Sequence, residues 1–285
     1  ARAQPGFALL AQPQVQVQDA AGRPVEASGF SFGLVAVVAA AFDASGATVP
    51  LLGTPAATLD TAGTGSGSVA IWTDLRVDPT GRCLRLRFTV VAVGGDAAGS
   101  VNGNSSTGGD AGASAALAAS LVAWSSKFDV LLGPPYKLAP ARQPTNETAG
   151  GIFTRQPVVE VRDAGGNLVS SDANGLVSAV LLNGDAWRLQ GGAGQIRSTS
   201  AGVATFTNLR MDLAGPCWVL AFVRLGCLTA YSKPFAVLPG PPAALQLVSP
   251  LASGPAPGRA LLVQPSIQVV DAWGNQLWDA AGLSV

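Results

Sequence analysis

The side chains that most often carry catalysis are sparse in this 285-residue chain. Histidine is absent, which removes the commonest general base and metal ligand near neutral pH. Catalytic triads and histidine-based metal sites are therefore excluded. The remaining acids, bases and nucleophiles form no recognisable constellation. We expect no enzyme, no metal site and no cofactor.

Two tripeptides fit the acceptor pattern for N-glycosylation, Asn104-Ser105-Ser106 and Asn146-Glu147-Thr148. The modification requires exposed backbone, and both tripeptides lie in segments that read as loops. We predict Asn104 and Asn146 as glycosylation sites. The alternative is that so short a pattern occurs by chance.

Three cysteines are present, an odd number without the clustered spacing of a zinc site. A disulfide between Cys217 and Cys227 would stabilise the fold by roughly 3 kcal/mol on the loop-entropy model, and we predict this bridge. A straight strand after Cys217 would separate the two by about 20 Å, against the roughly 4.4–6.8 Å that a disulfide allows between Cα atoms. The bridge therefore requires a broken strand. Cys83 is either a small core residue or a partner for another chain.

Aspartate recurs at one kind of turn, as Asp19, Asp163 and Asp271. Clustered carboxylates could bind calcium through their oxygens. The simpler interpretation is an Asx turn, in which the carboxylate accepts from backbone amides just ahead in the chain.

The aromatic residues raise a similar choice. Trp72 and Phe206 share a position in a repeated phrase, which indicates a core role. Trp187, Trp273 and Trp278 have no repeated counterpart. They are core residues or contacts for a glycan or a neighbouring chain.

These residues are positioned by a phrase that occurs three times, at Gln12–Gly22, Gln156–Asn167 and Gln264–Asn275. Its β-branched residues fall on alternate positions, which is typical of a half-buried strand. Asp-Ala-x-Gly follows, where Gly supplies the positive φ that reverses the chain. Each copy therefore predicts a strand that turns into a hairpin.

Two further phrases recur. Val69–Asp78 with Cys83 matches Val203–Asp212 with Cys217 at a constant offset of 134 residues. Phe128–Pro135 matches Phe235–Pro242, a last strand followed by a proline link that cannot continue a sheet. From Gln156 to Gln264 the spacing of copies is 108 residues, close to the roughly 100 of an immunoglobulin-type sandwich, whereas from Gln12 to Gln156 it is 144.

These phrases predict three domains, with residues 1–133 and 134–240 as full sandwiches and 241–285 as the start of a third. The first is longer, mainly in residues 94–120. This stretch is rich in Gly and Ala and has few large apolar side chains to offset the entropy of ordering. We expect a flexible loop there.

The overall composition agrees with short strands joined by turns. Apolar residues make up 48% and charged residues 12%, with 35 Gly and 20 Pro. Seventeen basic and seventeen acidic residues cancel, so neither nucleic acid nor an anionic membrane is an expected partner. The longest apolar run, Phe32–Phe42, is about half of the roughly 20 residues that a membrane helix needs. We expect a buried strand there and no membrane insertion in this segment.

The pattern Asp-Ala-x-Gly-Asn, then Gly202–Leu209, then Ser232–Val237 resembles the tandem immunoglobulin-like repeats of bacterial adhesins such as invasin and intimin, and those of filamin. The composition, rich in Ala and Gly, is similar to that of repeats in large green-algal cell-surface proteins, among them the mastigoneme-like protein of flagellar hairs. The resemblance implies an all-β fold of tandem immunoglobulin-like β-sandwiches. It also implies a stalk, filament or adhesive fibre with no catalytic residues.

Three functional hypotheses follow. The first is a structural repeat segment of an extracellular filament or cell-surface appendage, of flagellar-hair or cell-wall type, located at the cell or ciliary surface. Its partners would be copies of the same chain, other fibre subunits and glycans. The second is an adhesin or carbohydrate-binding module that presents loops to a receptor or glycan. The third, an intracellular filamin-like scaffold, requires free cysteines and unoccupied sequons.

Overall fold

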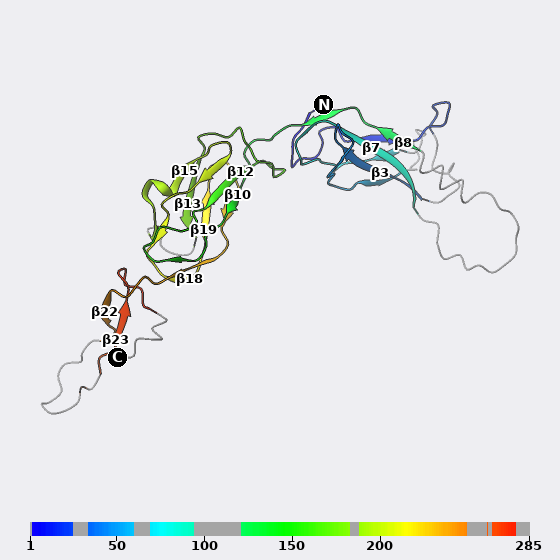
Figure 1. Cartoon of the computed structure of the whole chain (residues 1–285). Helices are drawn as coiled ribbons and strands as arrows, with labels where there is room; N and C mark the ends of the chain where they lie inside the picture. Colours follow the sequence, from blue (N-terminus) through cyan, green and yellow to red (C-terminus); the bar gives the residue numbers. More distant parts are fainter. Residues whose placement is uncertain are drawn as a thin grey trace, which may run out of the picture. The chain divides into compact units, whose positions relative to one another are not determined.

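The computed structural model describes residues 2–24, 34–59, 69–93, 121–182, 188–249, 261 and 264–277. In these residues the chain is all-β, as predicted, and the single short 3-10 helix is η3, Gly192–Gln195. Two compact units form (Figure 1). The first holds Ala1–Pro134 with Asp163–Asn167, and the second holds Pro135–Arg162 with Leu168–Val285.

The first unit is organised around two long strands, β3 and β7. The start of β7, from Gly81 to Leu84, pairs with β9, and the rest, from Arg85 to Val93, pairs with β3 and in part with β8. A register shift between Gly81 and Leu84 bends β7 at its start. The strands are β1 (Arg2–Ala3), β2 (Gln14–Gln16), β3 (Leu34–Phe42), β4 (Thr48–Val49), β5 (Ala56–Thr58), β6 (Val69–Ile71), β7 (Gly81–Val93), β8 (Val122–Trp124) and β9 (Phe128–Val130).

The second unit repeats this plan with shorter strands. A four-stranded sheet has the order β15-β13-β19-β20, and β10-β12-β16 and β11-β21-β18 form further sheets. The strands are β10 (Lys137–Arg142), β11 (Glu147–Thr148), β12 (Val158–Arg162), β13 (Leu176–Leu181), β14 (Leu189–Gln190), β15 (Ile196–Ser198), β16 (Val203–Thr205), β17 (Arg210–Met211), β18 (Gly215–Trp218), β19 (Leu220–Val223), β20 (Ala230–Tyr231) and β21 (Phe235–Leu238).

The last segment adds a hairpin of β22 (Ala244–Leu247) and β23 (Ile267–Val270). Ala244 pairs with Val270 as Lys137 pairs with Arg162 in β10 and β12. The repeated phrase therefore forms the same paired strand in both places.

Each unit has its own hydrophobic core between its sheets. Trp72 packs on Phe88 with ring centroids 5.2 Å apart, and Phe206 packs on Phe222 at 5.5 Å. Both pairs are buried, as predicted for Trp72 and Phe206. The run expected to form a buried strand is β3, in which alternate residues face the core.

The glutamine that opens the repeated phrase ties distant backbone groups together. The side-chain amide of Gln156 donates to the carbonyls of Phe153 and Leu209, and its oxygen accepts from the amide of Leu209. Gln12 makes the same three bonds with Leu9 and Leu75. These contacts explain why glutamine stands at the start of the strand in both units.

Several predictions lie outside the described residues: the loop 94–120 with Asn104, and the side chains of Trp187 and Trp278. Within the described part of the chain, no helix has the length and apolar character needed to cross a membrane.

Candidate functional site: the junction turn

All three recurring aspartates accept hydrogen bonds from backbone amides of their own turn, and Asp19 and Asp271 form Asx turns. The Oδ1 atom of Asp19 accepts from the amides of Ala21 and Arg23, both at 2.9 Å. Asp271 holds Trp273 and Asn275 in the same way, and Asp163 holds the amide of Asn167. Each aspartate thus closes its own hairpin, which is the simpler of the two interpretations. Among the described residues, no group of three or more His, Cys, Asp or Glu could hold a metal ion.

In two of the three turns a second set of bonds reaches outside the hairpin. We call Asp163–Asn167 and Asp271–Asn275 the junction turns. In the second unit, Asp271 Oδ2 accepts from the amide of Gly240 at 2.8 Å. Asn275 accepts from the amide of Ala214 at 2.9 Å and donates to the carbonyl of Asp212 at 2.7 Å. Both side chains are buried.

The first unit shows the same arrangement. Asp163 Oδ2 accepts from the amide of Gly133 at 3.1 Å, and Asn167 donates to the carbonyl of Asp78 at 2.7 Å. Asp78 and Asp212 are separated by the offset of 134 residues that relates the repeated phrases. The turn Asp163–Asn167 packs with the first unit, although the chain on either side of it belongs to the second.

Glycines line the places where the junction turns pack. Gly150 has φ of +77°, and a Cβ there would lie 1.9 Å from the ring of Trp273. Gly6 has φ of +81°, and its Cβ would lie 2.4 Å from Ala164. These residues are related by the 144-residue offset between Gln12 and Gln156. Only glycine combines this backbone conformation with so close an approach.

The carboxylate of Asp271 is stabilised by its surroundings. Burial acts to raise its pKa, but hydrogen bonds from Asn275, Gly240 and Trp273 outweigh burial, so the pKa is lowered. The charged form is therefore the one that holds the turn together. An aspartate buried in this way is a structural acceptor, not a general base.

The first turn of the chain differs at one position. Arg23 stands where the junction turns have asparagine, and its guanidinium pairs with Asp19 Oδ2 at 2.8 Å. That oxygen corresponds to the one that Gly133 and Gly240 bind in the junction turns. Asp19 is thus held within its own hairpin by Ala21 and Arg23.

The predicted glycosylation site Asn146 lies directly before β11, whose short pairing with β21 the sequence did not predict. Asn146 is exposed, and its Oδ1 accepts from the amide of Ala236 at 2.9 Å. Glu147, the middle residue of the sequon, is buried and accepts from the amide and hydroxyl of Thr154. Its carboxylate satisfies local groups and has no catalytic arrangement around it.

All three cysteines are free, so the predicted Cys217–Cys227 bridge is not formed in the structure. Cys217 is exposed on β18, and Cys227 follows β19 in a turn closed by a bond from its amide to the carbonyl of Arg224. The strand changes sheets between β18 and β19, but this break does not bring the sulfurs together. Cys83 is exposed on β7 and is not a core residue.

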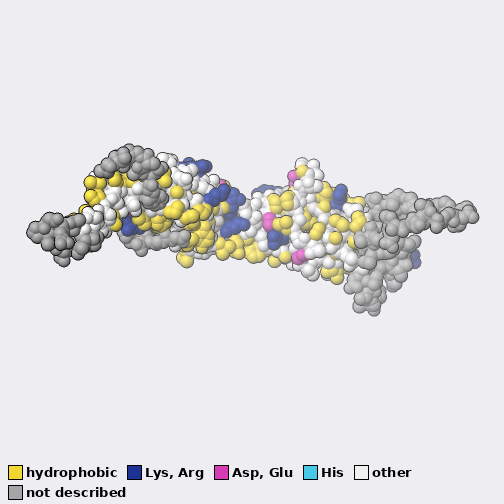
Figure 2. All heavy atoms as spheres, turned by 90° about the horizontal axis from the view of Figure 1, so that it is seen from below, with side chains coloured by type: hydrophobic (Ala, Val, Ile, Leu, Met, Phe, Trp, Pro, Cys, Tyr) yellow, Lys and Arg dark blue, Asp and Glu magenta, His cyan; other side chains and the backbone are white. Residues whose placement is uncertain are grey.

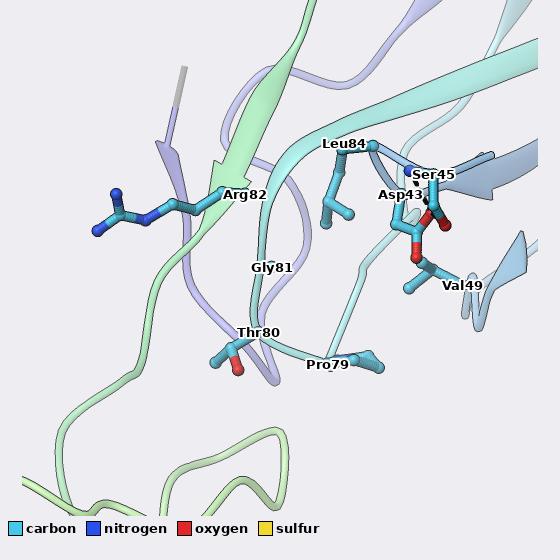
Figure 3. A pocket seen from close by; sticks show the side chains of 9 residues that line it. Asp43, Ser45, Val49, Pro79, Thr80, Gly81, Arg82 and Leu84 are labelled. Atoms are coloured by element: carbon cyan, nitrogen blue, oxygen red, sulfur yellow. Dashed lines mark hydrogen bonds between the residues drawn. The ribbon is translucent and has the colours of Figure 1, made fainter. Parts of the chain in front are cut away.

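A shallow pocket of about 370 Å³ lies in the first unit (Figure 3). Its lining combines Pro79, Val49 and Leu84 with the polar residues Asp43 and Ser45. Asp43 already accepts from the hydroxyl and amide of Ser45. Arg82 extends away from this pair in Figure 3. A ligand site requires polar groups that converge on a common point, and the polar groups of this pocket do not.

Of the two roles open to Trp273, the structure rules out the core. It is half exposed and packs on the junction glycines Gly150 and Gly240. The sequence predicted the Asx turn but not its outward bonds. The signal that could have found them is the asparagine that ends Asp-x-x-Gly-Asn in two copies and is Arg23 in the first.

Comparisons with known proteins identify no family for the chain. No protein-family model matches, and no curated protein sequence matches. A glycosyl hydrolase family 2 member from Bacteroides cellulosilyticus matches in structure with 11% identity and a TM-score of 0.32, over 71% of this chain and 21% of that one. Beta-glucuronidase 3 of Bacteroides uniformis matches with 12% identity and a TM-score of 0.26, over 81% and 22%. The chain spans about a fifth of the length of these proteins, and similarity at this level says nothing of its function.

Proposed function

We propose that the chain is a non-catalytic structural segment of an extracellular filament or cell-surface appendage. The observation that carries this proposal is the junction turn. The same aspartate, glycine and asparagine bonds join a turn to the sandwich that precedes it in the chain, once in each unit.

The bonds of the junction turn suit a structural role. They combine a buried charge-assisted acceptor with a side-chain amide that both donates and accepts. Bonds of this kind are worth roughly 1–3 kcal/mol each, because breaking them leaves buried groups unpaired. A segment that bears load needs such ties between the parts of the chain that follow one another. Their recurrence supports a repeated mechanical unit.

The other described features agree with this role. The Asp, Glu and Cys side chains described above either take part in structural hydrogen bonds or lie apart from one another. The exposed side chain of Asn146 is compatible with a secreted, glycosylated protein. Three free thiols fit the intracellular scaffold equally well, so the test below is chosen to separate the two.

The proposal is tested on native material from the cells that make the protein. Antibody labelling of intact, unpermeabilised cells is expected to mark a surface fibre or appendage. Mass spectrometry of the purified native chain is expected to show glycan on the Asn146 peptide. Labelling that appears only after permeabilisation, with Asn146 unmodified, would overturn the proposal in favour of the intracellular scaffold.

A further inference from the structure

The four-stranded sheet β15-β13-β19-β20 of the second unit has an unusual outer face. In β13, Val177, Ala179 and Leu181 face the core, so Leu176 and Val180 point outward, together with Leu182 just after the strand. Ile196 of β15, Val223 of β19 and Tyr231 of β20 share this outer face by register. All six are at least 39% exposed. We call them the outer face.

This face is apolar where an exposed sheet usually carries polar side chains. The other outward residues of its strands are Ser178, Ser198 and Ala221, so the strands themselves place no charge on it. Apolar side chains also cover much of the described surface visible in Figure 2, with charged groups scattered between them. Contiguous apolar patches of several hundred Å² mark interaction sites on soluble proteins.

The same pairing of strands recurs in the first unit. There β3 pairs with β5 and β7, and β7 pairs with β8, as β13 pairs with β15 and β19, and β19 with β20. Trp124 pairs with Arg87 as Tyr231 pairs with Ala221, and Arg87 and Ala221 are 134 residues apart. Trp124 is 50% exposed and Tyr231 is 53% exposed. The rest of the first unit's face differs, because Arg85, Arg87 and Thr89 of β7 point outward there, so the apolar outer face belongs to the second unit.

We infer that the outer face is a lateral contact surface for a second copy of this chain; this deepens the proposed structural function and rests on it. Six large side chains at about half exposure offer on the order of 500 Å² of apolar surface. This is less than the roughly 800 Å² per partner of a standard protein interface, so a contact between two such faces belongs to the weak class, with less than about 1,200 Å² buried in total. Every copy carries the same face, so a two-fold contact of the face with itself satisfies both partners.

A second copy fits the face better than a sugar does. Sugar sites place polar groups around an aromatic side chain to fix hydroxyl groups. The outward neighbours of Tyr231 are instead Ala221, Val180 and Val223. An apolar surrounding with a central aromatic residue is the composition of a protein interface core, where Tyr and Trp dominate the binding energy.

The inference is tested by sedimentation velocity on the whole chain across micromolar to sub-millimolar concentrations. The unmodified chain is expected to self-associate. Tyr231→Glu and Val180→Glu, which lie on different strands of the face, are each expected to weaken association by about tenfold or more. Ile152→Glu is the matched control, because Ile152 is similarly exposed but lies outside this sheet, and it is expected to associate normally.

Circular dichroism confirms that each variant is folded before it is compared. A chain that stays monomeric at all concentrations, or face variants that associate as well as the Ile152 control, would overturn the lateral contact. So would soluble oligosaccharide that binds and quenches Tyr231 in a monomeric chain. None of these results affects the outcome of the surface labelling or the glycan analysis. Failure of the lateral contact is therefore distinguishable from failure of the proposed function.

Discussion

Gln156 shows how single side chains hold this fold together. Its amide satisfies three backbone groups, one on nearby Phe153 and two on Leu209, which lies 53 positions from Gln156 in sequence. Serine plays a similar part. The hydroxyl of Ser232 accepts from the amide of Leu220, as that of Ser125 accepts from Leu86. The sequence showed that these residues recur, but their partners come from distant segments and could not be read from local pattern.

Replacing Gln156 by alanine is expected to destabilise the second unit by about 2–3 kcal/mol, because buried backbone groups at Leu209 lose their partners. Urea unfolding measures the change. Gln268→Ala is the control, since its side-chain bond to Gln246 is exposed. A loss no larger than that of the control would contradict the structural role of Gln156.

The cysteines differ in how readily they should react. Cys83 and Cys217 are exposed, whereas burial raises the pKa of Cys227, which packs against the core of its unit. A thiol-specific reagent should therefore label the first two quickly and Cys227 slowly on the native recombinant chain. Labelling of Cys83 alone would instead indicate that the Cys217–Cys227 bridge forms.

At the scale of elements, the sequence was most reliable where local chemistry decides the structure. Alternating β-branched residues correctly predicted β12, and the predicted Asx turn forms after two of the three copies, at Asp19 and Asp271. Very short strands such as β11 escaped prediction, because two residues carry no periodicity. The bridge predicted for Cys217 is absent because sequence spacing does not report the direction of side chains across a sheet change.

The pair of Asp172 and Arg224 links the turn before β13 to the end of β19. The carboxylate and guanidinium meet in two bonds of 2.6 Å, with little of either side chain exposed. Hydrogen bonds from Arg224 hold the pKa of Asp172 below its ordinary 3.8. Because this pKa is lowered on folding, the stabilisation is complete above pH 3.8 and is lost as pH falls through the lowered value.

Asp172→Asn is therefore expected to cost about 3 kcal/mol of unfolding free energy at pH 7, since it leaves the buried Arg224 without its charge partner. The difference from the unmodified chain should shrink as the pH falls below 3.8. Glu160→Gln, in a more exposed pair with Arg162, should cost much less. A difference that is independent of pH would show that Asp172 acts through packing and not through its charge.

Gly150 tests the packing of the junction turn. Gly150→Ala adds backbone strain and a methyl group that collides with Trp273, so it should displace the indole and change its fluorescence. The change is measured as the difference from the same variant carrying Trp273→Phe. Gly226→Ala is the matched control, because its φ of +78° is nearly the same and its Cβ would meet open space. Equal fluorescence in the two alanine variants would mean that Trp273 does not sit on Gly150.

At the scale of the whole molecule, the sequence indicated an all-β chain with repeated phrases, and the structure confirms the all-β fold. What the phrases could not reveal is that the turn ending each later copy bonds to the sandwich before it. That role depends on the carbonyls of Asp78 and Asp212, which lie far from the turns in sequence.

The central claim is that the junction turn is bonded to the sandwich it follows, and amide hydrogen exchange at Ala214 and Gly240 tests it most directly. Both amides donate to the junction turn and are expected to be protected in the unmodified chain. Asn275→Ala should reduce the protection of Ala214 by about tenfold, and that of Gly240 as well. Asn167→Ala, which alters the other junction turn, should leave both unchanged. Unprotected exchange at Ala214 and Gly240 in the unmodified chain would contradict the account.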